Sequence, residues 1–191
     1  MWREHVSAQQ QEAIDARYGS FAVYPYISPE RDLAAWLDEV ELSSAKAVPR
    51  WAMEVLDSSH GFDLTAGHVI LLWRVGFDTF HTDSWYPKYF EYTYGIDGPR
   101  ALQQLNDAGL VLIESAADSL DLVTGPAIKK ALKVAGVSGF SALKKDELQR
   151  WAVERLSSEQ LEELVSNRSL KLSETGRALL DANQSTVAKH P

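Results

Sequence analysis

The sequence predicts a mainly α fold that contains a small β element. Turn signals at residues 95–98, at Gly109 and at residues 136–141 separate segments whose apolar residues recur at helical spacing. Two short apolar segments, residues 110–113 and 170–172, are typical of strands. We therefore expect at least seven helices and at most one sheet, in which these two segments pair.

Residues 1–60 form a predicted N-terminal helical region. Residues 7–18 are rich in helix formers but hold few apolar anchors, so their helix is expected to pack along one edge. A second helix is predicted to begin with Ser28 as its cap and Pro29 in its first turn. The apolar stripe of this helix consists of Leu33, Trp36, Leu37 and Val40. Residues 48–56 predict a further short helix.

The predicted middle segment, residues 61–119, begins with a buried helix over residues 65–75 and an aromatic loop over residues 77–85. A further helix starts at Pro99 and ends at Gly109, which suits a left-handed C-terminal cap. The inner face of this helix holds Ala101, Leu102, Leu105 and Ala108. The first predicted strand follows directly.

This order of helix, glycine and strand resembles the second half of a winged-helix domain, and it is also a common junction between a helix and a strand. The resemblance implies that the helix enters the major groove of DNA. Arginine and glutamine can contact a base edge through two hydrogen bonds, although they are also ordinary surface residues. The outward polar residues expected on this helix are Arg100, Gln103, Gln104 and Asn106. The first three are the candidates for base contacts.

Residues 120–156 predict two short helices that are joined by a loop of small residues. The pattern is Thr124-x-x-x-Ile-Lys-x-x-Leu-Lys-x-x-Gly-Val, followed by Lys144-Lys-x-x-Leu. It resembles the SAP motif, a helix–extended loop–helix module that binds DNA, although the loop is longer and Leu143 replaces a common glycine. The buried seam between the helices is expected to contain Ile128, Leu132, Ala135, Leu148, Trp151 and Ala152.

The SAP resemblance implies that DNA is bound by basic residues of both helices. The matching residues are Lys129, Lys130, Lys133, Lys144 and Lys145. Lysines at a helix N-terminus oppose the helix dipole, so an anion docked near Lys144 and Lys145 would account for them. Extension of both side chains into solvent is the alternative. Some members of the family contact proteins instead of DNA.

Residues 157–183 form a predicted C-terminal strand–helix element with the sequence Leu170-Lys-Leu-Ser-Glu-Thr-Gly176. Bacterial and phage proteins pair a SAP-like segment with a following Leu-x-Leu-[Ser/Thr]-x-x-Gly element, and this chain is similar to that arrangement. If the two predicted strands pair, the SAP-like module is an insertion between them. Residues 184–191 are polar and are predicted to form a flexible tail.

The distribution of charge limits how this chain can meet DNA. The formal net charge is −8 overall, but it is −10 over residues 1–120, +3 over residues 121–156 and −1 over residues 157–191. DNA repels an acidic chain except at a local basic patch, so we expect a weak and local contact. A solvated charged face is the alternative interpretation of the same lysines.

The sequence predicts a protein that is not an enzyme and holds no cofactor or metal. It contains no nucleophile elbow, phosphate-binding loop or zinc-protease motif, and no cysteine, which excludes disulfides and thiolate ligands. A metal site at His60, Asp63 and His68 is disfavoured by the spacing of these residues. No apolar run approaches the length of a membrane span and the first residues lack a signal-peptide core, which favours a cytoplasmic protein without membrane contact.

Two classes of function remain open. The first is a non-enzymatic DNA-binding or DNA-associated protein that uses the local basic patch. The second is a protein-interaction or structural protein, derived from a phage or mobile element or acting as an acidic DNA mimic. An aromatic cluster favours the second class, since aromatic side chains with polar tips suit both cores and interfaces. This cluster consists of Trp85, Tyr86, Tyr89, Phe90, Tyr92 and Tyr94. The partner is thus DNA or a protein, and the oligomeric state is left open.

Overall fold

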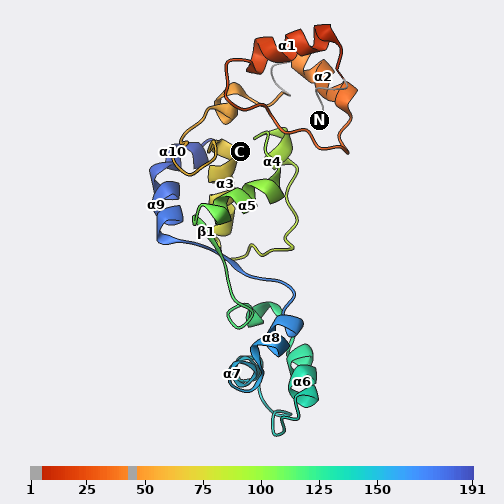
Figure 1. The fold of residues 1–191 in the computed structure, drawn as a ribbon, viewed down its shortest axis with the longest axis vertical. Helices are drawn as coiled ribbons and strands as arrows, with labels where there is room; N and C mark the ends of the chain where they lie inside the picture. Colours follow the sequence, from red (N-terminus) through yellow and green to blue (C-terminus); the bar gives the residue numbers. More distant parts are fainter. Residues whose placement is uncertain (1–5, 43–46) are drawn as a thin grey trace. The chain divides into compact units, whose positions relative to one another are not determined.

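The computed structural model describes residues 6–42 and 47–191 (Figure 1). In this part of the chain the fold is mainly helical, with ten α-helices, two short 3-10 helices and one two-stranded sheet. The predicted mainly α class is therefore confirmed. The chain forms two compact units, of which the first comprises Met1–Arg74, Trp85–Val111 and Leu172–Pro191, and the second comprises Val75–Ser84 and Leu112–Lys171.

The first unit contains most of the helices. Their bounds are Ala8–Tyr18 (α1), Leu33–Leu42 (α2), Arg50–Met53 (the 3-10 helix η2), Ala66–Val75 (α3), Tyr89–Tyr92 (α4), Gly98–Asp107 (α5), Glu174–Ala182 (α9) and Gln184–Val187 (α10). The core of this unit surrounds α3, in which Val69, Ile70, Leu71 and Leu72 have no exposed surface. Helix α5 is amphipathic as predicted, with Ala101, Leu102 and Leu105 buried. It is followed by Gly109, which has the expected positive φ of 68°.

The N-terminal region differs from the prediction at two helix boundaries. Helix α2 begins at Leu33, because residues 29 and 30 form a turn and Asp32 Oδ1 accepts a hydrogen bond from the Ala35 backbone N–H at 3.1 Å. Asp32 therefore has the capping role that was predicted for Ser28. The helix predicted over residues 48–56 is reduced to η2. Residue 40 of the predicted apolar stripe lies outside the side chains that are described.

The two predicted strands pair with each other. Strand β1 (Val111–Ile113) and strand β2 (Leu170–Leu172) form the two-stranded sheet. The chain enters the second unit within β1 and returns to the first unit within β2, so residues 112–171 are an insertion between paired strands. Residues 75–84 complete the second unit, in which His81 forms a bridge with Ser169.

The second unit contains the predicted helix–loop–helix module and one helix more. Its elements are the 3-10 helix η3 (Leu120–Leu122), α6 (Gly125–Val134), α7 (Lys145–Arg155) and α8 (Ser158–Leu164). The chain is not helical between Val134 and Lys145, which confirms the loop. Ile128, Leu132, Leu148 and Ala152 are at most 2% exposed, whereas Ala135 and Trp151 are only partly buried against them. Helix α8 adds Leu161 and the adjoining Val165 to the same core, so the module is not separate from the segment that follows it.

The structure places a helix where a flexible tail is expected. Residues Gln184–Val187 form α10, and the amides of Asn183 and Gln184 donate hydrogen bonds to backbone carbonyls one turn earlier, at 2.9 and 3.1 Å. The His190 ring then packs against Trp73 and Tyr89, with ring centroids 5.4 and 4.8 Å apart. Local polarity did not indicate these contacts, because they depend on an aromatic cluster that is distant in the sequence.

Candidate functional site

The lysines of α6 lie outside the buried seam of the helix–loop–helix module. Lys130 and Lys133 are exposed and Lys129 is half-buried, whereas Ile128 and Leu132 have no exposed surface. The helical repeat places residues 129, 130 and 133 within one arc, so their charged side chains extend from the same side of α6. We call these three residues, together with Lys144 and Lys145, the lysine patch.

Two members of the lysine patch are held by the backbone of the module. Lys129 Nζ donates to the Ser141 carbonyl at 2.7 Å, and Lys145 Nζ donates to the Asp121 carbonyl at 2.7 Å. These bonds join α6 to the loop and α7 to η3. Among the residues described, the ammonium groups of Lys130, Lys133 and Lys144 make no hydrogen bond or ion pair. Three of the five cations are therefore free to meet an anion.

Carboxylates lie close to the start of α7. Asp146 and Glu147 are in its first turn, and Glu147 Oε2 accepts a hydrogen bond from the Lys144 backbone N–H at 2.9 Å. They stabilise the positive end of the helix, which offsets the unfavourable position of the two lysines. Helix α6 itself contains no acidic residue, and the acidic residue of α8 that shares a pocket with Lys130 is Glu163.

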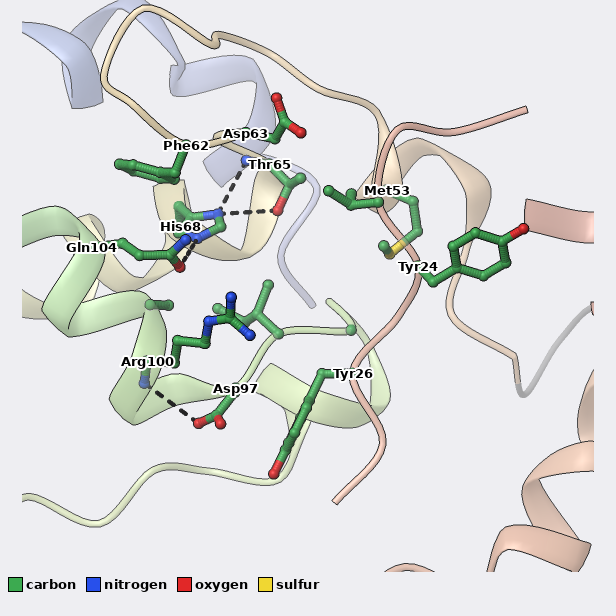
Figure 2. A pocket seen from close by; sticks show the side chains of 14 residues that line it. Tyr24, Tyr26, Met53, Phe62, Asp63, Thr65, His68, Asp97, Arg100 and Gln104 are labelled. Atoms are coloured by element: carbon green, nitrogen blue, oxygen red, sulfur yellow. Dashed lines mark hydrogen bonds between the residues drawn. The ribbon is translucent and has the colours of Figure 1, made fainter. Parts of the chain in front are cut away.

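Arg100 and Gln104, which were predicted to contact bases, line a pocket in the first unit (Figure 2). The cavity measures about 390 Å³ and is bounded by residues of η2, α3, α5 and the segments next to them. We call it the His68 pocket. Its lining includes Tyr26, Met53 and Ile96, and the lysine patch contributes no residue to it.

The imidazole of His68 is buried at one end of this pocket and is neutral. The Thr65 backbone N–H donates to His68 Nδ1 at 3.1 Å, so the ring proton must reside on Nε2. His68 Nε2 therefore donates to Gln104 Oε1 at 3.4 Å. Burial lowers the pKa of His68 to about 4, and the hydrogen bond to Gln104 opposes this shift only in part.

The Arg100 guanidinium is the positive group of the His68 pocket. It projects into the space between His68 and Tyr26 in Figure 2. Asp97 is adjacent, but its Oδ1 accepts from the Arg100 backbone N–H at 3.4 Å and thereby caps α5. Across the described part of the chain, the guanidinium forms no ion pair. It is therefore available to a ligand.

The outward polar face expected on α5 is largely engaged within the first unit. Gln104 accepts from His68, and Asn106 Nδ2 donates to the Val111 carbonyl at 2.9 Å. Gln103 is exposed and bonds Asp107 on its own helix at 2.7 Å. Arg100, Gln103 and Gln104 lie within one arc of α5, where Arg100 and Gln103 are exposed and Gln104 is half-buried.

The predicted aromatic cluster divides between core and surface. Phe90 and Tyr94 are at most 1% exposed, and the Tyr94 hydroxyl lies 2.7 Å from His190 Nδ1. Trp85, in contrast, is 73% exposed, beside a groove of about 410 Å³ that is also lined by Tyr86 and Tyr92. This exposed end is the part of the cluster that a partner could contact.

The comparisons with known proteins assign no relative to this chain. No family model matches it, and neither the curated proteins nor the solved structures contain a match.

Two further properties follow from the residues that the structure describes. In residues 6–42 and 47–191, no group of three His, Asp or Glu side chains is arranged to hold a metal ion. In the same residues, no helix has the length and apolar content needed to cross a membrane. The sequence did not predict the contact between His68 and Gln104. The helical pattern around His68 predicts that this residue is buried, but no local signal links it to residue 104.

Proposed function

We propose that the protein is a non-enzymatic DNA-associated protein that contacts the phosphate backbone through the lysine patch of its second unit. The observation that supports this most directly is the free and exposed state of Lys130, Lys133 and Lys144 beside the helix–loop–helix seam. Residues 121–156 carry a net charge of +3 in a chain of −8. The resemblance of this module to the SAP motif supports the same conclusion.

The proposed contact is made to phosphates and not to bases. Lysine is a flexible point charge that neutralises phosphate without reading sequence. Two of the three α5 residues that could read bases are engaged within the first unit, Gln104 with His68 and Gln103 with Asp107. Binding is therefore expected to be weak, similar for all duplex sequences and strongly dependent on salt.

The salt dependence of DNA binding tests this proposal. If the patch neutralises about three to five phosphates, log K should fall with log[salt] with a slope of about −3 to −4.5. Replacing Lys130 and Lys133 by alanine should flatten the slope by about 2 units, because two phosphate contacts are lost. Fluorescence anisotropy of a labelled duplex, titrated at several salt concentrations, measures the slope.

Lys88 and Lys189 provide the matched control, since both are exposed lysines of the first unit. Lys88→Ala/Lys189→Ala changes the net charge as much as Lys130→Ala/Lys133→Ala does, so long-range repulsion is equal in both variants. The proposal is contradicted if both double variants flatten the slope equally. It is also contradicted if the protein does not bind DNA at low salt. We chose Lys130 and Lys133 over Lys144 and Lys145 because Lys145 also holds η3 through the Asp121 carbonyl.

A second candidate function, interaction with a protein partner, is favoured by the exposure of Trp85. A tryptophan that is 73% exposed next to a groove is a typical interface anchor. The groove wall is preorganised, because the Arg31 guanidinium lies 4.0 Å from the Tyr92 ring centroid and also pairs with Glu91. The groove is thus formed before any partner binds.

A photo-crosslinking residue at position 85 tests this second candidate. We expect discrete protein adducts when the crosslinker replaces Trp85, and none when it replaces Val134, an apolar residue of the second unit that is 79% exposed. Trp85→Ala should leave the melting temperature unchanged, since the side chain buries little surface. Equal adducts at both positions would show non-specific contact and remove the candidate.

A further inference from the structure

We infer that the His68 pocket binds a small organic monocarboxylate, whose carboxylate pairs with Arg100 and whose apolar part lies against Tyr26 and Phe62. The inference is independent of DNA binding by the second unit. It rests on the volume of the cavity, the free guanidinium within it, and the chemistry of its walls.

The size of the pocket matches a small ligand. Its volume of about 390 Å³ lies within the range of small-molecule sites. The Gly95 backbone (φ 62°) lies close to the side chains of Pro25 and Met53, where a Cβ would approach them to 2.8 and 2.9 Å. This part of the wall is therefore closely packed and does not collapse into the cavity.

Arg100 provides the charge and the geometry for a carboxylate. A guanidinium presents parallel N–H groups that match the two carboxylate oxygens. Asp97 lies next to Arg100 in the sequence, yet it caps the helix through the backbone instead of pairing with this guanidinium. In Figure 2 the Asp63 carboxylate also points away from Arg100. Neither acid of the pocket thus occupies the place of the ligand.

Gln104 provides a second donor to the same ligand. Because neutral His68 donates from Nε2 to Gln104 Oε1, the orientation of the amide is determined. Its NH₂ group has no partner among the described residues and can donate to a carboxylate oxygen. His68 is thus a positioning residue for Gln104, and it carries no charge of its own near neutral pH.

The surrounding charges favour a monoanion over a phosphate. Asp63 and Asp97 both line the pocket with Arg100, so the lining is net negative before a ligand enters. Burial, together with Asp97, Glu91 and Glu30, raises the pKa of the lining residue Tyr26, so its hydroxyl lies in a negative environment. A dianion experiences about twice this repulsion, whereas a monocarboxylate experiences it once and forms a direct ion pair with the guanidinium.

The remaining walls are apolar or aromatic. Tyr26 and Phe62 are half-buried and line the pocket, whereas Met53 and Ile96, which are 1% and 8% exposed, contribute little surface to it. Phe62 lies with its ring centroid 5.0 Å from that of His68 and closes the same end. An aliphatic or aromatic body of a few carbons therefore has a surface on which to pack.

An NMR titration of the full chain tests this inference. The probes are phenylacetate, phenethylamine, which has a similar body with the opposite charge, and inorganic phosphate. We expect phenylacetate to shift the Arg100 Nε–H and Gln104 side-chain amide resonances saturably, and the other two probes to leave them in place. Arg100→Gln should weaken phenylacetate binding by about tenfold or more, because the ion pair is lost.

The control is Arg177→Gln, which removes the same charge from an exposed position on α9 in the same unit. It should leave phenylacetate binding unchanged. Arg100→Lys keeps the charge but loses the paired donors, so an intermediate affinity is expected. No saturable shift with phenylacetate, equal shifts with phosphate or phenethylamine, or equal losses in Arg100→Gln and Arg177→Gln would each overturn the inference.

Discussion

Replacing Gly176 by alanine is expected to lower the free energy of unfolding by about 3 kcal/mol, at the upper end of the usual cost of overpacking. A Cβ at this position would lie 2.0 Å from the Leu110 carbonyl oxygen, a backbone atom that cannot rotate away. The Ser173 backbone N–H and hydroxyl also donate to that carbonyl, at 3.1 and 3.2 Å. The methyl group must therefore push the first turn of α9 away from Leu110 and break these bonds. Chemical denaturation followed by circular dichroism measures the loss.

Gly125→Ala is the matched control for this prediction. Gly125 also lies in the first turn of a helix, but its Cβ would meet only Leu148 Cδ1 at 3.8 Å, an ordinary contact. Alanine is a better helix former than glycine, but a Cβ before Pro126 disfavours helical backbone, so these effects offset each other and the variant should stay within about 1 kcal/mol of the wild type. If Gly176→Ala is as stable as Gly125→Ala, the close contact between α9 and Leu110 does not exist.

Leu132→Ala should destabilise the second unit by about 2–5 kcal/mol, because it leaves a cavity in the seam between α6 and α7. Leu132 has no exposed surface and belongs to the same core as Leu148, Ala152 and Leu161. Native-state hydrogen exchange should show faster exchange for the amides of α6, α7 and α8. The amides of α3 and α5 should keep their protection, since those helices belong to the core of the other unit.

Val134→Ala provides the control within the same helix. Val134 is 79% exposed, and its truncation should change stability by no more than about 0.5 kcal/mol. Trp151→Ala should cost less than the roughly 3–5 kcal/mol of a fully buried tryptophan, because its ring is only partly buried beneath Arg155. Equal loss of protection in both units after Leu132→Ala would show that they unfold together.

Several elements were predictable because the signals that determine them are local. The boundaries of α5 follow from Pro99 and Gly109, one with a constrained φ and one that readily adopts a positive φ. The inward positions of Ile128, Leu132 and Leu148 follow from the 3.6-residue period of an amphipathic helix. The pairing of β1 with β2 was also anticipated, from the resemblance of the two segments to the strands of a winged-helix domain. The wrong predictions of local structure were small. For example, Asp32 caps α2 instead of Ser28, and these two capping candidates are four positions apart.

The sequence alone therefore determined the class of the fold, the helix–loop–helix module and the exposure of its lysines. Only the tertiary structure decided which distant residues contact each other. It pairs Gln104 with His68, His190 with Tyr94 and Gly176 with Leu110. It also places the Lys129 and Lys145 ammonium groups against backbone carbonyls of the module. The physical reason is that helix periods and caps arise within a few residues, whereas these contacts join residues between 12 and 96 positions apart. Whether Arg100 faces a pocket or open solvent depends on how α3, α5 and the segment around Tyr26 pack, which no local pattern encodes.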